Sequence, residues 1–155
     1  MAQLKYKIST IGSHSALQIF KGAHDEGFET IAVCKKGCES PYKMFNAADE
    51  IISVDSYKEF PKIEENLIKK NAIVIPHGSF VTYMGYEKVE KLKVPYYGNK
   101  KILKWESDRN LEKQWLKNAG LKVPMLFNRP KDIDRLVIAK FMGAEGGKGY
   151  FLAKD

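Results

Sequence analysis

Cysteines and long apolar runs are scarce in this sequence, and each scarcity excludes a class of protein. Two cysteines among 155 residues, Cys34 and Cys38, flank Gly37, but two thiols do not complete a zinc site, and we interpret them as reduced. No stretch approaches the roughly 18 uninterrupted apolar residues of a membrane span. Lys5 and Lys7 interrupt the segment in which a signal peptide would need an apolar region. The sequence therefore predicts a cytoplasmic protein that does not bind a membrane.

Positive charge is in excess, with 26 lysines and arginines against 19 aspartates and glutamates and a formal net charge of +7. Such an excess attracts nucleic acids, membrane surfaces and small anions by the same electrostatics. The lysines are spread along the chain among acidic residues, without a dense basic run or an aromatic motif typical of RNA binding. The distribution favours a small phosphate-bearing ligand over nucleic acid, and we interpret part of the excess as solvated surface.

A strand, a helix and a second strand are predicted at the start of the chain. Residues 6–11 alternate and are rich in β-branched residues, which is typical of a strand. Ser13 or Ser15 then caps a helix that Gly27 ends. The apolar stripe of this helix is formed by Ala16, Leu17, Ile19, Phe20 and Ala23. With a buried strand over residues 28–33, the segment predicts a βαβ unit with parallel strands and a right-handed crossover.

The following residues continue this alternation less regularly. We expect a loop over residues 34–42, a strand within 48–54 and a helix over 63–70. Residues 72–76 form a short, all-apolar strand, which is typical of the centre of a parallel sheet. The pattern predicts the α/β class, with a doubly wound parallel sheet in a first domain over residues 1–99.

A second domain is predicted to begin at residue 100. Residues 101–119 have helical periodicity, with Ser107 placed to cap a second helix inside the stretch. Strands over 136–141 and 150–153 then form a hairpin. A hairpin of this length is marginal by itself, so we interpret residues 100–155 as a second domain that is cut short. An open sheet edge would also favour association into a homo-oligomer.

The tip of this hairpin is the strongest chemical signal in the sequence. Four glycines within residues 143–149 let the backbone approach a ligand closely, and successive N–H groups can surround phosphate oxygens. Lys140 and Lys148 add positive charge. The segment is not a Walker A loop, because Lys148 is followed by Gly149 rather than Ser or Thr, and it is not a dinucleotide fingerprint, because no helix follows. It is similar to the flap that covers ATP phosphates in kinases and ATP-grasp enzymes.

Two further polar segments follow predicted parallel strands. Ser13, His14 and Ser15 come after the first strand, and His77 and Ser79 lie in a turn after the strand over 72–76. The carboxyl ends of parallel strands meet at one edge, where ligands of open α/β sheets bind, so these residues can converge on one phosphorylated ligand. Each histidine can instead serve as a structural hydrogen-bonding group. No nucleophile has a recognisable triad partner, so no catalytic residue is assigned.

Six motifs, taken together, resemble one family. They are Gly12-Ser13-His14-Ser15, Lys21-Gly22-Ala23, Pro76-His77-Gly78-Ser79-Phe80, Pro95-Tyr96-Tyr97-Gly98-Asn99, Trp105-Glu106-Ser107-Asp108-Arg109 and residues 143–151. In this order they resemble the archaeal formate-dependent 5-formaminoimidazole-4-carboxamide ribonucleotide synthetases, which are ligases of purine biosynthesis.

The resemblance implies a pre-ATP-grasp domain followed by an ATP-grasp domain. It also implies that ATP activates formate to formyl phosphate, which the amine of 5-aminoimidazole-4-carboxamide ribonucleotide attacks to give the formamide, ADP and phosphate. Such chemistry needs positioning and charge neutralisation more than a protein nucleophile. On this resemblance His14 and Ser79 bind the ribonucleotide. The start of the ATP site is formed by Ile138, Lys140, Gly143, Ala144, Gly146, Gly147, Lys148 and Gly149.

The resemblance has limits that bear on activity. The family is about twice as long as this chain, and its Mg²⁺-binding carboxylates lie in the part absent here, so no metal ligand is assigned. We expect the chain alone to lack catalysis and to retain ribonucleotide binding. Three alternatives stay open: an ATP-grasp ligase acting on another phosphorylated metabolite, a non-catalytic module that senses a purine nucleotide, and, last, a nucleic-acid-binding protein.

Overall fold

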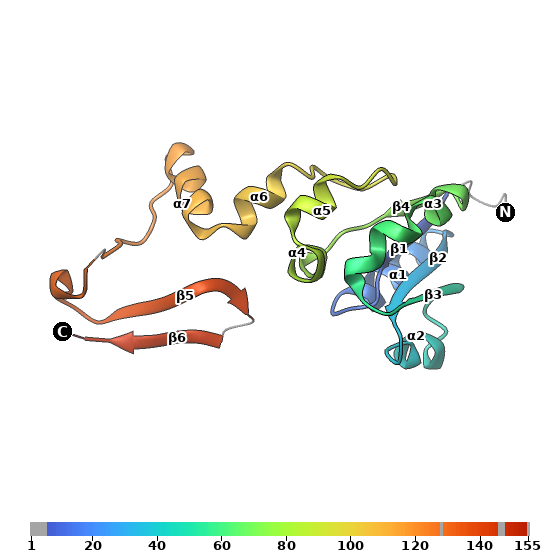
Figure 1. Cartoon of the computed structure of the whole chain (residues 1–155), viewed down its shortest axis with the longest axis horizontal. Helices are drawn as coiled ribbons and strands as arrows, with labels where there is room; N and C mark the ends of the chain where they lie inside the picture. The colour runs from blue at the N-terminus through green and yellow to red at the C-terminus, as the bar shows by residue number, and fades with distance from the viewer. Residues whose placement is uncertain (1–5, 128, 146–147, 155) are drawn as a thin grey trace. The chain divides into compact units, whose positions relative to one another are not determined.

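The chain forms two compact units in a computed structural model that describes residues 6–127, 129–145 and 148–154 (Figure 1). Unit 1 runs to Lys100 and unit 2 begins at Lys101. Within the described ranges, no helix has the length and apolar character needed to cross a membrane.

Unit 1 is built on a four-stranded parallel sheet in the order β3-β2-β1-β4. The inner strand β1 (Lys7–Ile11) pairs with β2 (Glu29–Lys35) on one side and with β4 (Ala72–Val74) on the other, and β3 (Glu50–Val54) pairs with β2. Residues 30–34 of β2 are all buried, as expected for an inner strand covered on both faces. The predicted α/β class with a parallel sheet is confirmed.

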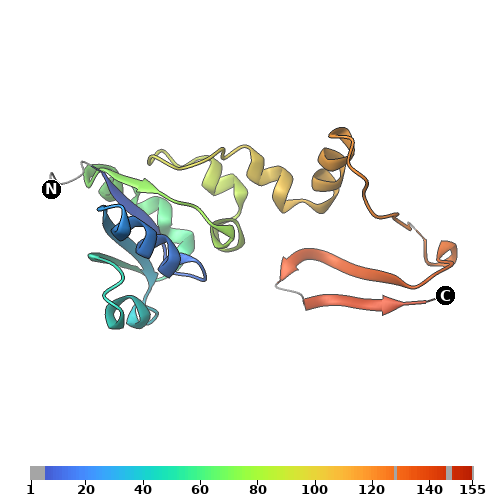
Figure 2. The same cartoon turned by 180° about the vertical axis from the view of Figure 1, so that it is seen from behind.

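Helices cover both faces of this sheet. β2 and then β3 are added on one side of β1, whereas β4 is added on its other side. Right-handed crossovers in these two opposite directions place α1 (Ala16–Asp25) and α3 (Phe60–Lys69) on opposite faces of the sheet. α3 lies in front of the sheet in Figure 1, and α1 lies in front in the reverse view of Figure 2. The shorter elements of unit 1 are α2 (Ser40–Met44), η1 (Tyr57–Glu59), α4 (Gly78–Met84) and α5 (Tyr86–Glu90).

Each face of the sheet has an aromatic contact in its core. Phe20 of α1 meets Tyr42 of α2 edge to face, with ring centroids 5.9 Å apart. On the other face, Phe60 of α3 meets Phe80 of α4 at 5.5 Å. The three phenylalanines are fully buried, so these contacts fix the helices against the sheet.

A polar network closes the amino edge of the sheet. The Asp49 carboxylate accepts hydrogen bonds from the Thr30 N–H at 2.7 Å and from the Thr30 hydroxyl at 2.9 Å. His24, near the end of α1, places Nε2 3.0 Å from the same carboxylate oxygen. The network ties α1, β2 and the start of β3 together at the edge opposite the strand ends that carry the candidate site.

Three local predictions in unit 1 were wrong. The predicted loop over 34–42 contains the start of α2, which carries a proline in its first turn. β4 is the last named strand of the sheet rather than a central one; Ala72 and Val74 are nevertheless buried, and Val74 also forms a parallel bridge to Tyr96. The predicted turn at 77–79 is the start of α4, with His77 as the N-cap residue.

Unit 2 contains two helices, a short 3₁₀ turn and a hairpin. Its elements are α6 (Ile102–Ser107), α7 (Arg109–Asn118), η2 (Pro130–Asp132), β5 (Val137–Glu145) and β6 (Lys148–Ala153). Asp108, not Ser107, caps the second helix: its Oδ1 accepts from the N–H groups of Asn110 and Leu111. Asp108 immediately precedes α7, whereas Ser107 ends α6 and donates to the carbonyl of Lys104.

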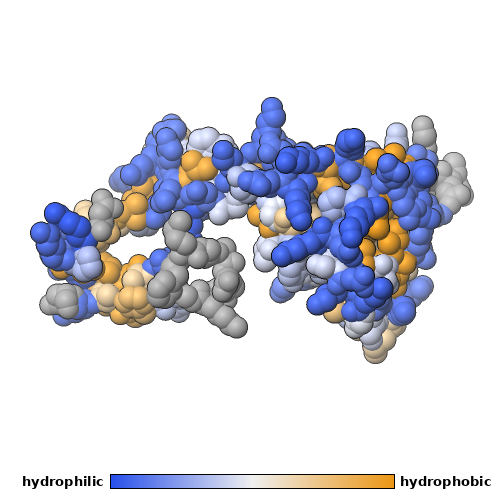
Figure 3. All heavy atoms as spheres, in the orientation of Figure 1, coloured by the Kyte–Doolittle hydropathy of each residue, from blue (hydrophilic) through white to orange (hydrophobic). Residues whose placement is uncertain are grey.

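The hairpin exposes apolar side chains on both faces. Ile138 lies opposite Leu152 in the register, and their side chains are 57% and 61% exposed. Phe151, on the other face of the hairpin, is 52% exposed. Figure 3 shows apolar surface over this part of the chain. A two-stranded sheet with apolar residues on both faces needs further structure to cover it.

The aromatic contact on the α1 face generates a stability prediction. Phe20→Ala leaves a cavity beside Tyr42, so we expect the free energy of unfolding to fall by about 3–5 kcal/mol. Phe45→Ala is the matched control: Phe45 is 70% exposed, and its loss should change stability by less than about 0.5 kcal/mol. Urea denaturation followed by circular dichroism measures both. Equal losses in the two variants would contradict the core described above.

Candidate functional site

Gly12, the residue after β1, forms the base of the candidate site at the carboxyl ends of the parallel strands, and we call it the floor of the site. The Gly12 N–H donates to the Val33 carbonyl at 2.7 Å, and the Gly12 carbonyl accepts from the Tyr57 hydroxyl at 2.5 Å. A Cβ at this position would lie 2.8 Å from both Cys34 Sγ and Tyr42 Cε2. Glycine is required here because the neighbouring side chains leave no space for a methyl group.

Three of the predicted ligand-binding residues meet above this floor. Ser13 Oγ lies 2.9 Å from Ser79 Oγ and 3.2 Å from His14 Nδ1. The two hydroxyls come from segments 66 residues apart, the loop after β1 and the first turn of α4. Ser15 is the N-cap residue of α1, but its exposed side chain makes no capping hydrogen bond. The parallel sheet therefore brings Ser13, His14 and Ser79 together, as predicted from their positions after the carboxyl ends of parallel strands.

His77 binds the backbone beside this group. Its Nε2 lies 3.2 Å from the carbonyl oxygen of Ile11, which can only accept, so Nε2 carries the proton of the neutral ring. The ring also packs edge-on against Phe80, at 5.6 Å between centroids. Burial lowers the pKa of His77, the hydrogen bond to Ile11 opposes that shift, and the nearby His14 lowers the pKa further. His77 thus connects the segment after β4 to the end of β1.

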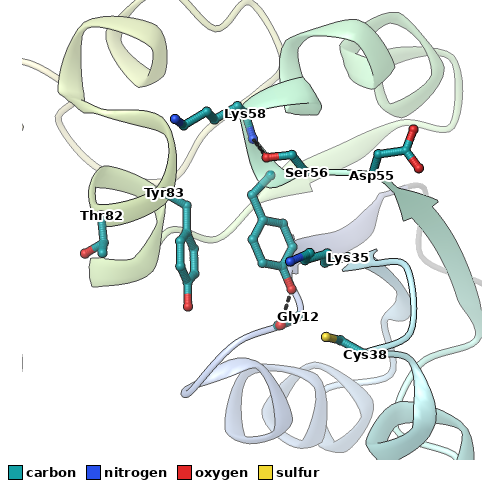
Figure 4. Close-up of a pocket in the computed structure, with 9 residues that line it drawn as sticks. Gly12, Lys35, Cys38, Asp55, Ser56, Lys58, Thr82 and Tyr83 are labelled. Carbon is teal, nitrogen blue, oxygen red and sulfur yellow. Dashed lines mark hydrogen bonds between the residues drawn. The ribbon is translucent and has the colours of Figure 1, made fainter.

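A pocket of about 500 Å³ lies at the carboxyl ends of the strands, and Gly12, the residue before Ser13, lines it (Figure 4). Residues from the ends of β1, β2 and β3 and from α4 line it, among them Gly12, Lys35, Cys38, Lys58, Thr82 and Tyr83. Sequence reasoning did not single out the lysines or tyrosines of this pocket. These residues could have been predicted from their positions just after strands. Ligands of open α/β sheets bind at the carboxyl ends of the strands, and this applies to the segments after β2 and β3 as it does to Ser13 and Ser79.

Both cysteines are free, and they differ in accessibility. Burial raises the pKa of the Cys34 thiol to about 12, so this thiol stays neutral and is a poor nucleophile at ordinary pH. Cys38 is exposed and lines the pocket. Neither arrangement gives a catalytic thiol with an activating base.

The predicted phosphate flap is mostly strand in unit 2. β5 extends through Gly143 and Ala144 to Glu145, and β6 starts at Lys148 and includes Gly149, so the expected open loop is shorter than predicted. Gly146 and Gly147 lie outside the described residues. The strands pair in antiparallel register, with Lys140 opposite Tyr150.

Two of the residues predicted to contact ATP, Ile138 and Lys140, lie in β5. Ile138 and Lys140 are two residues apart in β5, so their side chains point to the same face of the hairpin, and both residues are exposed. An apolar group beside a cation suits a base and its phosphates. In the described part of the chain, no group of three or more histidine, cysteine, aspartate or glutamate side chains is placed to hold a metal ion, so these residues do not by themselves form a Mg²⁺ site.

Comparison with known proteins identifies relatives of this chain. A family model described as a protein of unknown function, DUF1246, matches residues 8–127. The 5-formaminoimidazole-4-carboxamide-1-(beta)-D-ribofuranosyl 5'-monophosphate synthetase of Pyrococcus abyssi is 54% identical over 156 residues, covering 100% of this chain and 44% of that protein. The synthetase of the same name from Methanopyrus kandleri is 50% identical over 151 residues, covering 96% of this chain and 42% of the relative. The chain thus spans less than half the length of these curated relatives and matches their N-terminal part.

Solved structures share the fold. The IMP biosynthesis protein PurP from Thermococcus kodakaraensis superposes with a TM-score of 0.71 at 30% identity, covering 96% of this chain and 50% of that one. N5-carboxyaminoimidazole synthetase from Staphylococcus aureus, in complex with ADP, gives 0.71 at 20% identity, covering 100% of this chain and 43% of that one. The predicted resemblance to the formaminoimidazole-carboxamide ribonucleotide synthetases, which are ATP-grasp ligases, is confirmed, as is the ATP-grasp type of α/β fold.

The half-buried ring of His77 predicts a pH dependence of stability. Its folded pKa lies below the ordinary value of 6.5, so the unfolded chain takes up the proton first as the pH falls. The contribution of His77 to stability is therefore complete above about pH 6.5 and is lost as the pH falls from there toward the lower folded pKa. His77→Gln keeps a donor for Ile11 and removes the titration, so the variant should lose less stability between about pH 7 and 5. Urea unfolding at several pH values tests this, and equal pH slopes in both proteins would contradict it.

Proposed function

Since the chain belongs to the protein family DUF1246, we propose that it is the N-terminal part of a ligase that formylates 5-aminoimidazole-4-carboxamide ribonucleotide with ATP and formate. In this proposal unit 1 is the pre-ATP-grasp domain that binds the ribonucleotide, and unit 2 is the start of the ATP-grasp domain. The reaction belongs to purine biosynthesis in the cytoplasm, as the product named in the curated relatives suggests.

The hydroxyl pair of Ser13 and Ser79 is the observation that supports ribonucleotide binding in unit 1. Two hydroxyls at 2.9 Å, with His14 beside one of them, can exchange their mutual hydrogen bond for bonds to a ligand. Each hydroxyl can both donate and accept, which suits the hydroxyl and phosphate oxygens of a ribose phosphate. The floor formed by Gly12 holds the two segments together before the ligand arrives, and this reduces the entropy lost on binding.

In the proposed reaction the side chains of this part of the protein position the substrates and form no covalent bond with them. ATP supplies the phosphoryl group that converts formate to formyl phosphate, releasing ADP. The amine of the ribonucleotide then attacks the formyl carbon, and phosphate leaves. Ser13, His14 and Ser79 position the ribonucleotide for that attack, while Ile138 and Lys140 contact ATP.

The remaining assignments in the flap belong to the same proposal. Gly143, Ala144, Lys148 and Gly149 belong to the proposed ATP site, as do Gly146 and Gly147, which lie outside the described residues. The Mg²⁺ that accompanies the phosphates is held by carboxylates in the part of the relatives that this chain does not span. Formate and the ribonucleotide are the other two substrates.

Substitution of the hydroxyl pair tests the ribonucleotide site. We expect Ser79→Ala and Ser13→Ala each to weaken binding of 5-aminoimidazole-4-carboxamide ribonucleotide about 5- to 10-fold, because each removes one hydrogen-bonding group. The double variant should lose less than the product of the two, since the hydroxyls contact each other. Calorimetric titration measures the affinities, with Ser40→Ala on exposed α2 as the control. Wild-type affinity in both single variants would contradict the site.

The division of the chemistry between the two parts of the relatives predicts the behaviour of the chain alone. We expect the 155-residue chain to bind the ribonucleotide but to form no ADP that depends on both formate and ribonucleotide. A coupled ADP assay measures the second property. Turnover by the chain alone would show that the residues present here complete the active site.

A further inference from the structure

The pocket lined by Gly12 has two lysines that the proposed mechanism does not use. Lys35 ends β2 and Lys58 lies in η1, and both line the pocket. Neither ammonium group has an ion pair or hydrogen bond to another described side chain. Figure 4 shows Lys35 and Cys38 on one side of the pocket and Thr82 and Tyr83 of α4 on the other.

Two acidic residues in or beside the pocket lining, Asp55 and Glu59, pair with lysines outside it. Asp55 lines the pocket, but its carboxylate is directed away from Gly12 in Figure 4 and pairs with Lys36 at 2.6 Å. Glu59 pairs with Lys62 at 2.5 Å. Lys36 and Lys62 are outside the pocket lining, so the lining keeps a positive potential from Lys35 and Lys58.

The remaining walls provide hydrogen-bonding groups and apolar surface. Tyr57 and Tyr83 pack with ring centroids 5.0 Å apart and form one wall. The Ser56 hydroxyl oxygen accepts from the Lys58 N–H at 3.3 Å, which leaves the Ser56 O–H able to donate to a ligand. The volume of about 500 Å³ lies within the range of small-molecule sites.

We infer that this pocket binds a phosphate monoester, with Lys35 and Lys58 supplying the charge and Ser56 a hydrogen bond. Lysines bind phosphate groups as point charges, and two of them can meet the two negative charges of a phosphate monoester. Two lining residues are close neighbours of the serine pair along the chain: Gly12 precedes Ser13, and Tyr83 lies one helical turn after Ser79.

The phosphate group has two possible sources. It can belong to the ribonucleotide whose ribose contacts Ser13 and Ser79, in which case the inference rests on the proposed function and locates the phosphate end of that substrate. It can instead belong to a second phosphorylated metabolite that occupies the pocket separately. The chemistry of the pocket is the same in both cases, and matched ligands distinguish them.

The experiment is calorimetric titration of the 155-residue chain and of its Lys35→Ala and Lys58→Ala variants. The ligands form two pairs that differ only by the phosphate: 5-aminoimidazole-4-carboxamide ribonucleotide with its nucleoside, and ribose 5-phosphate with ribose. Lys69→Ala and Lys88→Ala are the matched controls, because both lysines are exposed and outside the pocket lining. Circular dichroism confirms that each variant is folded.

We expect each pocket substitution to weaken binding of the phosphorylated ligands about 10-fold, with less than about 2-fold change for the nucleoside and in the control variants. The effect should shrink at high salt, because the pocket is open to solvent. In one outcome ribose 5-phosphate binds, the lysine substitutions weaken that binding, and the ribonucleotide does not bind. This outcome supports a phosphate site for a separate ligand and contradicts the proposed function. Wild-type phosphate affinity in both lysine variants, or no binding of any phosphorylated ligand by the folded chain, overturns the inference.

Discussion

The carboxyl edge of unit 1 depends on how β1 ends. The backbone of Ile11 and Gly12 forms hydrogen bonds with three separate segments: the β2 backbone at Val33, the Tyr57 hydroxyl after β3 and the His77 ring after β4. These contacts fix the positions of the loops that carry the polar side chains. Because a side chain at position 12 would meet Cys34 of β2 and Tyr42 of α2, the arrangement also requires glycine at this position. The positions of the binding groups therefore follow from backbone contacts rather than from the loops themselves.

Periodicity and the handedness of parallel connections were sufficient to predict the sheet, because β1, β2 and β3 each carry a distinct pattern of β-branched or apolar residues. The short helices were missed because five to seven residues contain too little pattern to separate a helix from a turn. The edge position of β4 was missed for another reason: Val74 is buried and also bridges to Tyr96, and the strand has the apolar composition of a central one. At Ser107 and Asp108 the sequence offers two adjacent capping residues, and only the helix boundary distinguishes them.

The serine pair was predictable for the same reason as the sheet, since both residues follow parallel strands. The pocket lined by Gly12 was not, because its charge depends on which lysines already have partners. In the sequence, Lys35 and Lys36 are equivalent neighbours; in the fold, one pairs with Asp55 and the other lines the pocket. The flap was predicted from its glycines, yet the pairing of Glu145 with Lys148 continues the strands further than a glycine-rich segment indicates. The proposed ribonucleotide-binding residues and the hairpin thus belong to different compact units of one chain.

The network of His24, Thr30 and Asp49 lies at the amino ends of the strands of unit 1, opposite the ends that carry Ser13, His14 and Ser79. Hydrogen bonds that hold the strands in register are therefore separated from the groups that contact small molecules. In evolutionary terms, a lineage can exchange the loops after β1, β2, β3 and β4 without altering this anchor. Such a separation explains how one scaffold can diversify among different metabolites: selection for a new ligand acts at one end of the strands, while selection for persistence of the fold acts at the other.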